Sequence, residues 1–305
     1  SRCPRPCSLL SPALPASHGK LRRLAGRFRR RVGGLTFQYR LLLRHLQVHH
    51  SKPEIMKYFM NDSLLFDPGT DWSYSNSGYF VLGLIVEKIS GMSLVDYIQK
   101  NLFDPAGMKN SYIGTHEKII PNLVTGYERA SDATYKVASY LSWTWPYAAG
   151  DILSSVDDML KWDEALYSDR ILKKEWRERA WKSFTLSNGQ ETNYGFGWSL
   201  GKYGDVNIIG HGGAINGFLS DGIRIPSKHL YLVILSNKAI KSPGEFSSLI
   251  ALRVAGDPIK EYTPINMSGK QLQDYVGAYE VHRVGGRITK NTTKDKMYRY
   301  IIVKN

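Results

Sequence analysis

Residues 68–79 read PGTDWSYSNSGY, and the chain then continues through an apolar stretch that ends at Gly91. From residue 78 to residue 91 apolar side chains recur at intervals of three or four, which predicts a helix with one buried face. These side chains are Val81, Leu82, Ile85, Val86 and Ile89. The Pro-Gly pair before the helix predicts a turn. This turn and helix are the clearest folded unit, and the rest of the fold is built outward from them.

The hydrophobic period predicts further elements on both sides of this helix. Helices are predicted at residues 54–60, 94–102, 154–166, 176–181 and 245–254. Short strands are predicted at residues 194–200 and 206–210, and an antiparallel pair at residues 217–225 and 230–237. Central helices, then meandering strands, then a last helix indicate an α/β (α+β) fold, in which helices and a helical subdomain flank an antiparallel sheet.

The composition is that of an ordinary globular protein, except for the placement of its charges. The chain has 305 residues, of which 42% are hydrophobic and 22% charged, so a sizeable core is expected and global disorder is excluded. Of the 41 Lys and Arg residues, 12 lie within residues 1–52, where no Asp or Glu occurs. The net charge of +14 therefore comes almost wholly from this N-terminal segment.

The N-terminal segment is rich in Pro and Arg and differs in texture from the rest of the chain. Such a segment can bind nucleic acid or an anionic membrane surface, but the plainer interpretation is that it belongs to no folded module. The two cysteines, Cys3 and Cys7, are too few for a zinc site. No apolar run approaches the roughly 18 residues of a membrane span, and no signal peptide is visible.

Two local motifs are candidates for chemistry, because the sequence contains no G-x-S-x-G elbow, Walker A loop, G-x-G-x-x-G or H-E-x-x-H. The first is Tyr74-Ser75-Asn76. The second is His211-Gly212-Gly213-Ala214, predicted to lie between the strand that ends at residue 209 and the strand after residue 217. Taken singly, Tyr74 and Asn76 could be a buried aromatic and a turn residue, and His211 could be structural.

Taken together and in this order, the motifs resemble those of the serine β-lactamase / penicillin-binding-protein-like family, in its class C, esterase and D-aminopeptidase branch. YAAGDILSSVDD at residues 147–158 resembles the family's gly-gly-leu-x-ser-thr-x-x-asp pattern. YGFGW at residues 194–198 and HGG at residues 211–213 resemble its late strands. The resemblance implies a β-lactamase/transpeptidase-like fold, and residues 272–280 resemble the start of the small β domain often appended to these enzymes.

The resemblance also implies acyl transfer through a serine ester, by Ser-x-x-Lys, Tyr-x-Asn and His-x-Gly elements. Tyr74 would be the general base and later the acid, and Asn76 would hydrogen-bond the substrate amide and the lysine. His211 would supply positive or donor character beside Tyr74. The two glycines after His211 fit close approach of a ligand, and the Ala214 N–H would be an oxyanion donor.

Ser17 is the candidate nucleophile and Lys20 the candidate lysine, because the two form a Ser-x-x-Lys match upstream of Tyr74, as the family order demands. On a helix this spacing would put both side chains on one face. Arginines follow the motif here, whereas an apolar helix follows it in the family. A second match, Ser199 to Lys202, is rejected because it falls in a strand-to-turn segment that cannot open a helix.

Three functional hypotheses follow. The first is a serine acyl hydrolase that acts on β-lactams, D-amino peptides or small esters. The second is an inactive protein of the same fold that lacks the nucleophile and acts, if at all, as a binding module. In that case residues 1–50 would come from a truncated, rearranged or frame-shifted reading frame. The third is a nucleic-acid or membrane-surface binder through the Arg cluster, which rests on charge alone.

The expected organisation has three parts: a basic N-terminal segment at residues 1–51, a catalytic domain at residues 52–258, and a linker with the start of a small β domain at residues 259–305. The catalytic domain would be incomplete at its N-terminus. The expected partner is a small-molecule or peptide substrate, with no nucleic acid, transmembrane segment, metal or organic cofactor. Oligomeric state and localisation stay open, since the family is usually exported but no signal peptide is visible.

Overall fold

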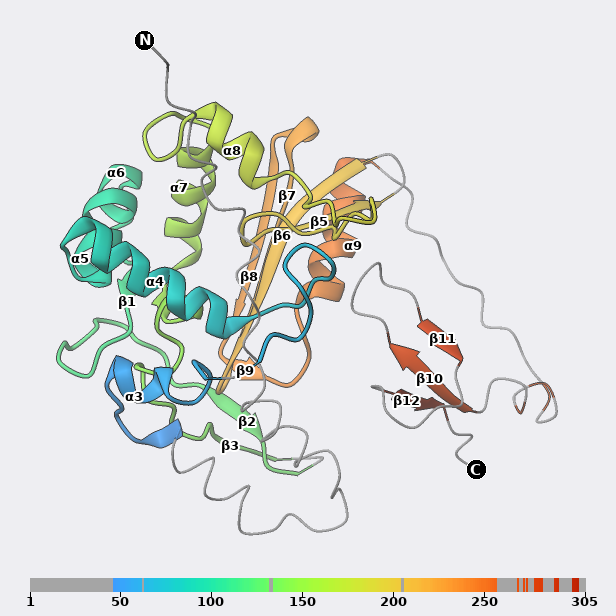
Figure 1. Ribbon diagram of the computed structural model, residues 1–305, viewed down its shortest axis with the longest axis horizontal. Helices are drawn as coiled ribbons and strands as arrows, with labels where there is room; N and C mark the ends of the chain where they lie inside the picture. The colour runs from blue at the N-terminus through green and yellow to red at the C-terminus, as the bar shows by residue number, and fades with distance from the viewer. Residues whose placement is uncertain are drawn as a thin grey trace.

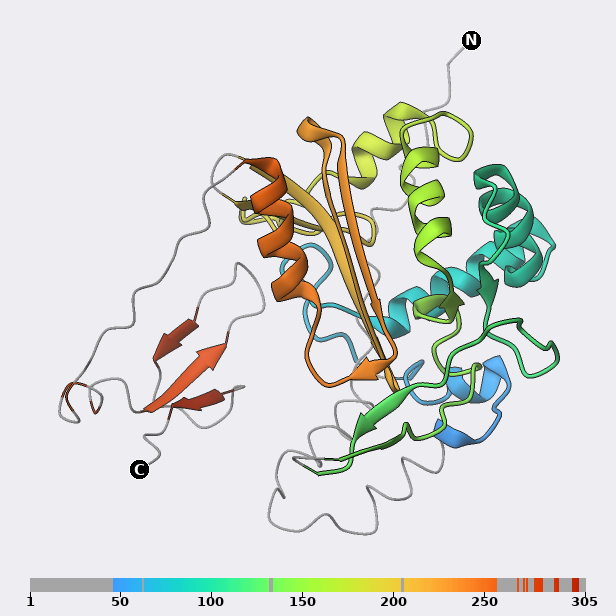
Figure 2. The same ribbon diagram turned by 180° about the vertical axis from the view of Figure 1, so that it is seen from behind.

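The computed structural model describes residues 46–61, 63–131, 134–203 and 206–256, together with short pieces between residues 268 and 301. Its architecture is mixed α/β, as predicted, with an antiparallel sheet between helices (Figures 1 and 2). Ser17 and Lys20 lie outside the described residues.

The central sheet has four antiparallel strands in the order β5-β6-β7-β8. These strands are β5 (Ser199–Tyr203), β6 (Val206–Ile215), β7 (Phe218–Ile225) and β8 (Leu230–Ser236). Gly213 pairs with Ser220 across β6 and β7, which fixes the register of the hairpin. β5 pairs with β6 only up to Gly210. Residues 211–215 of β6 therefore have β7 on one side and no described strand on the other.

Helix α9 (Gly244–Ala255) covers one face of this sheet, and the helical region covers the other (Figures 1 and 2). Ala251 of α9 packs in a buried cluster with Ile223 and Ile225 of β7. Since side chains alternate across a strand, the even-numbered residues of β7 face the helical region. Arg224 shows this, because it forms an ion pair with Asp163 of α7 (Val156–Leu166) at 2.8 Å.

The helical region is organised around α4 (Asn76–Ser90), which matches the predicted helix closely. It ends at Gly91, whose φ of 68° is the left-handed conformation of a helix C-cap. Phe80 of α4 lies in a buried cluster with Ile55, Phe59, Leu94 and Tyr147. The other helical elements are α3 (Lys52–Met56), α5 (Leu94–Ile98), η1 (Gln99–Phe103), α6 (Asp104–Ala106), η2 (Tyr147–Ala149), α8 (Lys174–Ala180) and η3 (Pro226–Lys228).

Smaller strands complete the described fold. β1 (Tyr112–Ile113) pairs with β4 (Ile152–Leu153), and a three-stranded sheet joins β3 (Tyr135–Val137), β2 (Tyr127–Arg129) and β9 (Lys238–Ala239). Near the C-terminus β10 (Gly277–Val281) lies between β11 (Ile288–Lys290) and β12 (Tyr298–Ile301) in a separate antiparallel sheet. The proposed domain bounds stay a prediction.

Two helix predictions need correction. The helix predicted at residues 54–60 begins at Lys52 and ends at Met56. The helix predicted at residues 94–102 continues through the π-helical turn η1 into α6. Pro105 has no N–H and its ring would clash with a carbonyl in the preceding α-helical turn, so the chain widens there before it continues.

Two strand predictions are also wrong at their bounds. Tyr194 forms only an isolated bridge with Ser199, where β5 begins. Gly197 lies between them with a φ of 78°, which is a turn conformation that a strand does not contain. The strand predicted to end at residue 210 continues to Ile215. The His211-Gly212-Gly213-Ala214 motif therefore lies inside β6, held by its pairing with β7.

No single helix of the described residues is long and apolar enough to cross a membrane. By length and composition alone, α4 and the bent helical segment 94–106 pass that test only as a pair, with 81° between them. Phe80 and Gly83 of α4 are buried inside the fold, as in a core helix.

Candidate active site

The Tyr74-Ser75-Asn76 motif forms the start of α4. Ser75 is the N-cap, and its Oγ accepts the N–H of Gly78 at 3.0 Å. Tyr74 lies just before the helix with 37% of its surface exposed, and Asn76 is the exposed first helical residue. The middle residue of the motif thus has a structural task, which is to hold the turn that carries its two neighbours.

Packing of this turn beside the sheet brings Tyr74 next to His211 of β6. The two ring centroids are 5.9 Å apart and the ring planes are inclined by 35°. The sequence-predicted neighbours are therefore brought together, although they lie far apart in the chain. Their catalytic roles stay a prediction.

The residues after His211 expose the backbone of β6. Gly212, Gly213 and Ala214 are all exposed. A side chain at Gly213 would have its Cβ 2.5 Å from the Oγ of Ser220, so the serine hydroxyl would have to turn away to make room for it. Because β5 begins at Ser199, opposite Gly210, one backbone edge of this segment is not covered by a described strand. An edge of this kind can donate N–H groups to a ligand.

Tyr194 is a residue of this site that sequence reasoning missed. Its hydroxyl lies 2.8 Å from Nε2 of His211. Its ring meets Tyr74 edge to face at a centroid distance of 6.3 Å, and it packs against Trp72 at 5.1 Å. It also shares a hydrogen bond with Tyr79 of α4. Tyr194 thus contacts both predicted motifs.

One signal in the sequence could have found Tyr194. It opens the YGFGW stretch, in which two glycines stand close together. A Cβ on Gly195 would collide with the carbonyl oxygen of Ala180, and Gly197 adopts a positive φ. Glycines needed at two such positions indicate a tightly determined turn, and a tyrosine placed by that turn is a candidate for function.

Burial shapes the chemistry of the phenols in this cluster. It raises the pKa of Tyr74 above the ordinary phenol value. It is also the largest cause of the raised pKa values of Tyr79 and Tyr194. Tyr74 raises both pKa values further, whereas the hydrogen bond with Tyr194 partly offsets the rise at Tyr79. The described cluster therefore holds its phenols protonated at neutral pH, which suits donation of a proton.

The predicted nucleophile and lysine, Ser17 and Lys20, lie outside the described residues, so their positions relative to Tyr74 stay a prediction. The rejected match, Ser199 to Lys202, lies in strand β5. Residues three apart on a strand point to opposite faces, so these two side chains do not share a face. The rejection of that match is confirmed.

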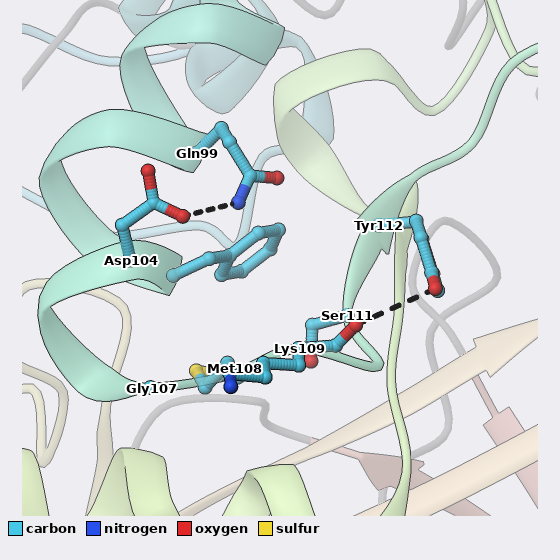
Figure 3. A pocket seen from close by; sticks show the side chains of 8 residues that line it. Gln99, Asp104, Gly107, Met108, Lys109, Ser111 and Tyr112 are labelled. Atoms are coloured by element: carbon cyan, nitrogen blue, oxygen red, sulfur yellow. Dashed lines mark hydrogen bonds between the residues drawn. The ribbon is translucent and has the colours of Figure 1, made fainter.

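A surface hollow of about 350 Å³ lies elsewhere, beside η1 and α6 (Figure 3). Gln99 and Asp104 on its rim bind each other at 2.7 Å, and none of the predicted site residues lines it. In the described part of the chain, no cluster of three or more His, Cys, Asp or Glu side chains could hold a metal ion.

Comparison with known proteins decides the family. The Beta-lactamase family model matches residues 30–255, which is well over half of the chain. The chain belongs to the Beta-lactamase family. This confirms the resemblance read from the Tyr-x-Asn and His-Gly-Gly motifs.

Curated relatives of this Beta-lactamase-family chain cover it in part. Penicillin-binding protein 4* of Bacillus subtilis is 32% identical over 201 residues, which are 61% of this chain and 44% of the relative. A D-aminopeptidase of Gluconobacter oxydans is 29% identical over 175 residues, which are 57% and 33% of the two chains. The chain thus spans less than half the length of these relatives.

Solved structures confirm the β-lactamase/transpeptidase-like fold. The octameric penicillin-binding protein homologue of Pyrococcus abyssi superposes with a TM-score of 0.64 at 22% identity, over 90% of this chain and 61% of that one. The D-amino acid amidase of Ochrobactrum anthropi SV3, complexed with L-phenylalanine amide, gives 0.57 at 24% identity, over 68% and 65%. At these identities the likeness shows the fold alone.

Proposed function

We propose that this Beta-lactamase-family chain carries the site of a serine acyl hydrolase for β-lactams, D-amino peptides or small esters. The observation that carries the proposal is the approach of Tyr74 to His211, with ring centroids 5.9 Å apart. The relatives include D-aminopeptidases and a penicillin-binding protein, which favours a D-amino acid peptide or amide among these substrates.

The proposed reaction passes through a serine ester. The hydroxyl oxygen of Ser17 attacks the substrate carbonyl carbon, while its proton passes to a base supplied by Lys20 and Tyr74. The bond to the leaving amine or alcohol then breaks, and that group takes a proton. Water attacks the ester, which releases the acid and returns the proton to the serine oxygen.

Tyr74 fits the proton-donating half of this cycle best. Burial raises the pKa of its phenol, so the proton stays on the oxygen until a leaving group accepts it. To accept the serine proton first, the phenolate needs a cation beside it, and the proposal gives this task to Lys20.

The remaining motif residues would bind and polarise the substrate. Asn76 lies exposed at the start of α4, next to Tyr74, where its amide can reach a substrate amide. Gly212 and Gly213 let the substrate approach the backbone, and the Ala214 N–H on the open edge of β6 would donate to the developing oxyanion.

A second candidate is an inactive protein of the same fold that serves as a binding module. The observation that favours it is the raised pKa of Tyr74, the opposite of what a general base needs. The two candidates differ in one respect that can be measured, which is whether any serine becomes acylated.

The test is to treat the full chain with a fluorescent penicillin and with a fluorophosphonate, and to map the labelled peptide by mass spectrometry. The expected result is a single labelled serine, Ser17. Tyr74→Phe should slow labelling by about 10²- to 10⁴-fold, since it removes a proton-transfer group. The matched control, Tyr140→Phe, removes a hydroxyl that binds His116 instead, and should label like the wild type.

Two outcomes would revise the proposal. A label on a serine other than Ser17 would keep the hydrolase and replace its nucleophile. No label with either reagent, together with no release of p-nitroaniline from a D-amino acid p-nitroanilide, would overturn the hydrolase in favour of the inactive alternative.

A further inference from the structure

We propose that Tyr194 is a positioning residue, which fixes the tautomer and the ring orientation of His211. The hydroxyl of Tyr194 lies 2.8 Å from Nε2 of His211. The catalytic consequence of this bond rests on the proposed function. The tautomer itself does not, and it can be measured without substrate.

The tautomer follows from the other ring nitrogen. Nδ1 of His211 lies 2.6 Å from the carbonyl oxygen of Gly212. A carbonyl oxygen can only accept, so Nδ1 carries the hydrogen. In the neutral ring Nε2 is then the acceptor, and the hydroxyl of Tyr194 donates to it. Both nitrogens of His211 thus have a hydrogen-bond partner within the protein.

The ring orientation follows from packing around Tyr194. The ring of Tyr194 stands edge-on to both His211 and Tyr74, at centroid distances of 5.8 and 6.3 Å. Trp72 packs against it at 5.1 Å. Tyr194 is therefore in contact with both members of the pair, and its ring limits the orientations open to the imidazole of His211.

The same tyrosine can serve either charge state of the imidazole. When His211 is protonated, Nε2–H donates to the oxygen of Tyr194, and the hydroxyl hydrogen of Tyr194 turns to its other partner, Tyr79. A phenylalanine in its place would keep the packing and lose both arrangements. Protonation of His211 would place a positive charge beside Tyr74 without breaking the network.

Backbone hydrogen bonds hold the turn that directly follows Tyr194. The N–H of Gly195 donates to the carbonyl of Trp198 at 2.8 Å, and the N–H of Phe196 donates to the carbonyl of Ala180 at 2.9 Å. Gly195 packs so closely against Ala180 that no side chain fits. A fixed backbone makes the position of the hydroxyl reproducible, as a positioning residue requires.

The test reads the imidazole directly, in the full chain labelled with ¹⁵N-histidine, at an alkaline pH where histidine is neutral. His211→Gln identifies the His211 signals by their loss. The wild type should show one tautomer with hydrogen on Nδ1, and Tyr194→Phe should show a mixture or a shifted Nε2 signal. Tyr140→Phe, which removes a tyrosine–histidine bond at His116, should leave the His211 signals unchanged.

A second variant guards against a general disturbance of the cluster. Tyr79→Phe removes the hydroxyl bonded to Tyr194 but not the one bonded to His211, so the tautomer should persist. The inference is overturned if wild-type His211 carries its hydrogen on Nε2, or if Tyr194→Phe leaves the ring signals unchanged. Loss of the signature in Tyr79→Phe as well would overturn the specific role of Tyr194.

Turnover gives an independent readout once a substrate is found. Tyr194→Phe should lower kcat at least about tenfold with little change in KM, and should alter the pH profile, because it changes a group that acts through His211. Absence of any acylation in the wild type, together with the expected tautomer, would reject the hydrolase and leave the positioning of His211 standing. An unaltered kcat in Tyr194→Phe would reject its catalytic consequence.

Discussion

Asp151 and Asp158 lie on one short segment and are both buried, yet their surroundings move their acidities in opposite directions. They are 5% and 0% exposed. Burial raises the pKa of Asp151 to about 7. Burial pushes the pKa of Asp158 the same way, but hydrogen bonds from Lys161, Ser111 and the backbone of Asn110 outweigh it and hold the pKa below its ordinary value. Donors, rather than depth, decide whether a buried carboxylate is charged.

The geometry of Asp158 shows how a buried charge can hold two elements together. Lys161 Nζ lies 2.8 Å from Oδ1, while Ser111 Oγ and the N–H of Asn110 lie 2.9 and 2.6 Å from Oδ2. Asp158 is in the first turn of α7, where the helix dipole favours a negative charge. The carboxylate thus ties α7 to the segment that follows α6.

The largest effect is expected from Asp158→Ala, which removes a buried carboxylate and takes one acceptor from the buried hydroxyl of Ser111. Removal of one partner from a buried charged pair costs about 3–5 kcal/mol, and the 40% exposure of Lys161 places this case at the lower end. The midpoint of urea unfolding should therefore fall sharply, as followed by circular dichroism. The matched control is Asp157→Ala, one residue earlier and exposed, which should change the free energy of unfolding by less than about 0.5 kcal/mol. Equal losses in both variants would show that Asp158 is no anchor.

Asp151→Asn is expected to raise the free energy of unfolding, but only at pH values above the acid range. The pKa of Asp151 rises from 3.8 in its ordinary state to about 7 in the fold. Below about pH 3, well under the ordinary pKa of 3.8, the group is protonated in both states and costs nothing. As the pH rises towards 7, Asp151 ionises in the unfolded chain first. The free energy of unfolding therefore falls by up to about 4 kcal/mol, and this loss persists above pH 7.

The neutral amide of Asp151→Asn avoids that loss. The variant should be more stable than the wild type at pH 8, with a difference that shrinks as the pH falls and disappears towards about pH 3, in urea titrations at several pH values. Asp157→Asn makes the same change at an exposed site, and its free energy of unfolding should depend on pH as that of the wild type does. A constant difference across pH would mean that the effect comes from shape rather than from ionisation.

The two carboxylates also show which features of the fold can be predicted from the local sequence. In the gly-gly-leu-x-ser-thr-x-x-asp pattern Asp158 takes the place of the aspartate, and the cap and helix around it were predictable from Ser155 and the apolar period. Asp151 stands where the pattern has its second glycine. Nothing in the local sequence predicts its burial, because the surfaces that cover it come from distant parts of the chain.

The candidate site also combines features that the local sequence predicts with features that only the fold reveals. The motif order predicted that Tyr74 and His211 would be neighbours, and they are. The extent of β6 was not predictable, because His211, Gly212 and Gly213 look like a break between strands until the pairing with β7 is known. The contact between Tyr194 and His211 was missed because a hydrogen bond between distant residues leaves no period in the sequence.

The smallest effect is expected from Ser155→Ala, which removes the cap of α7 without touching the carboxylate itself. Ser155 Oγ accepts the N–H of Asp158 at 3.3 Å, so its loss should cost about 1 kcal/mol in urea unfolding. Ser155→Asp should restore most of this energy, since aspartate also caps helices and suits the dipole. Ser155→Ala could instead lower the free energy of unfolding as much as Asp158→Ala does. The stability of α7 would then depend on its cap, and the hydrogen bonds to Asp158 would not explain why the fold tolerates this buried charge.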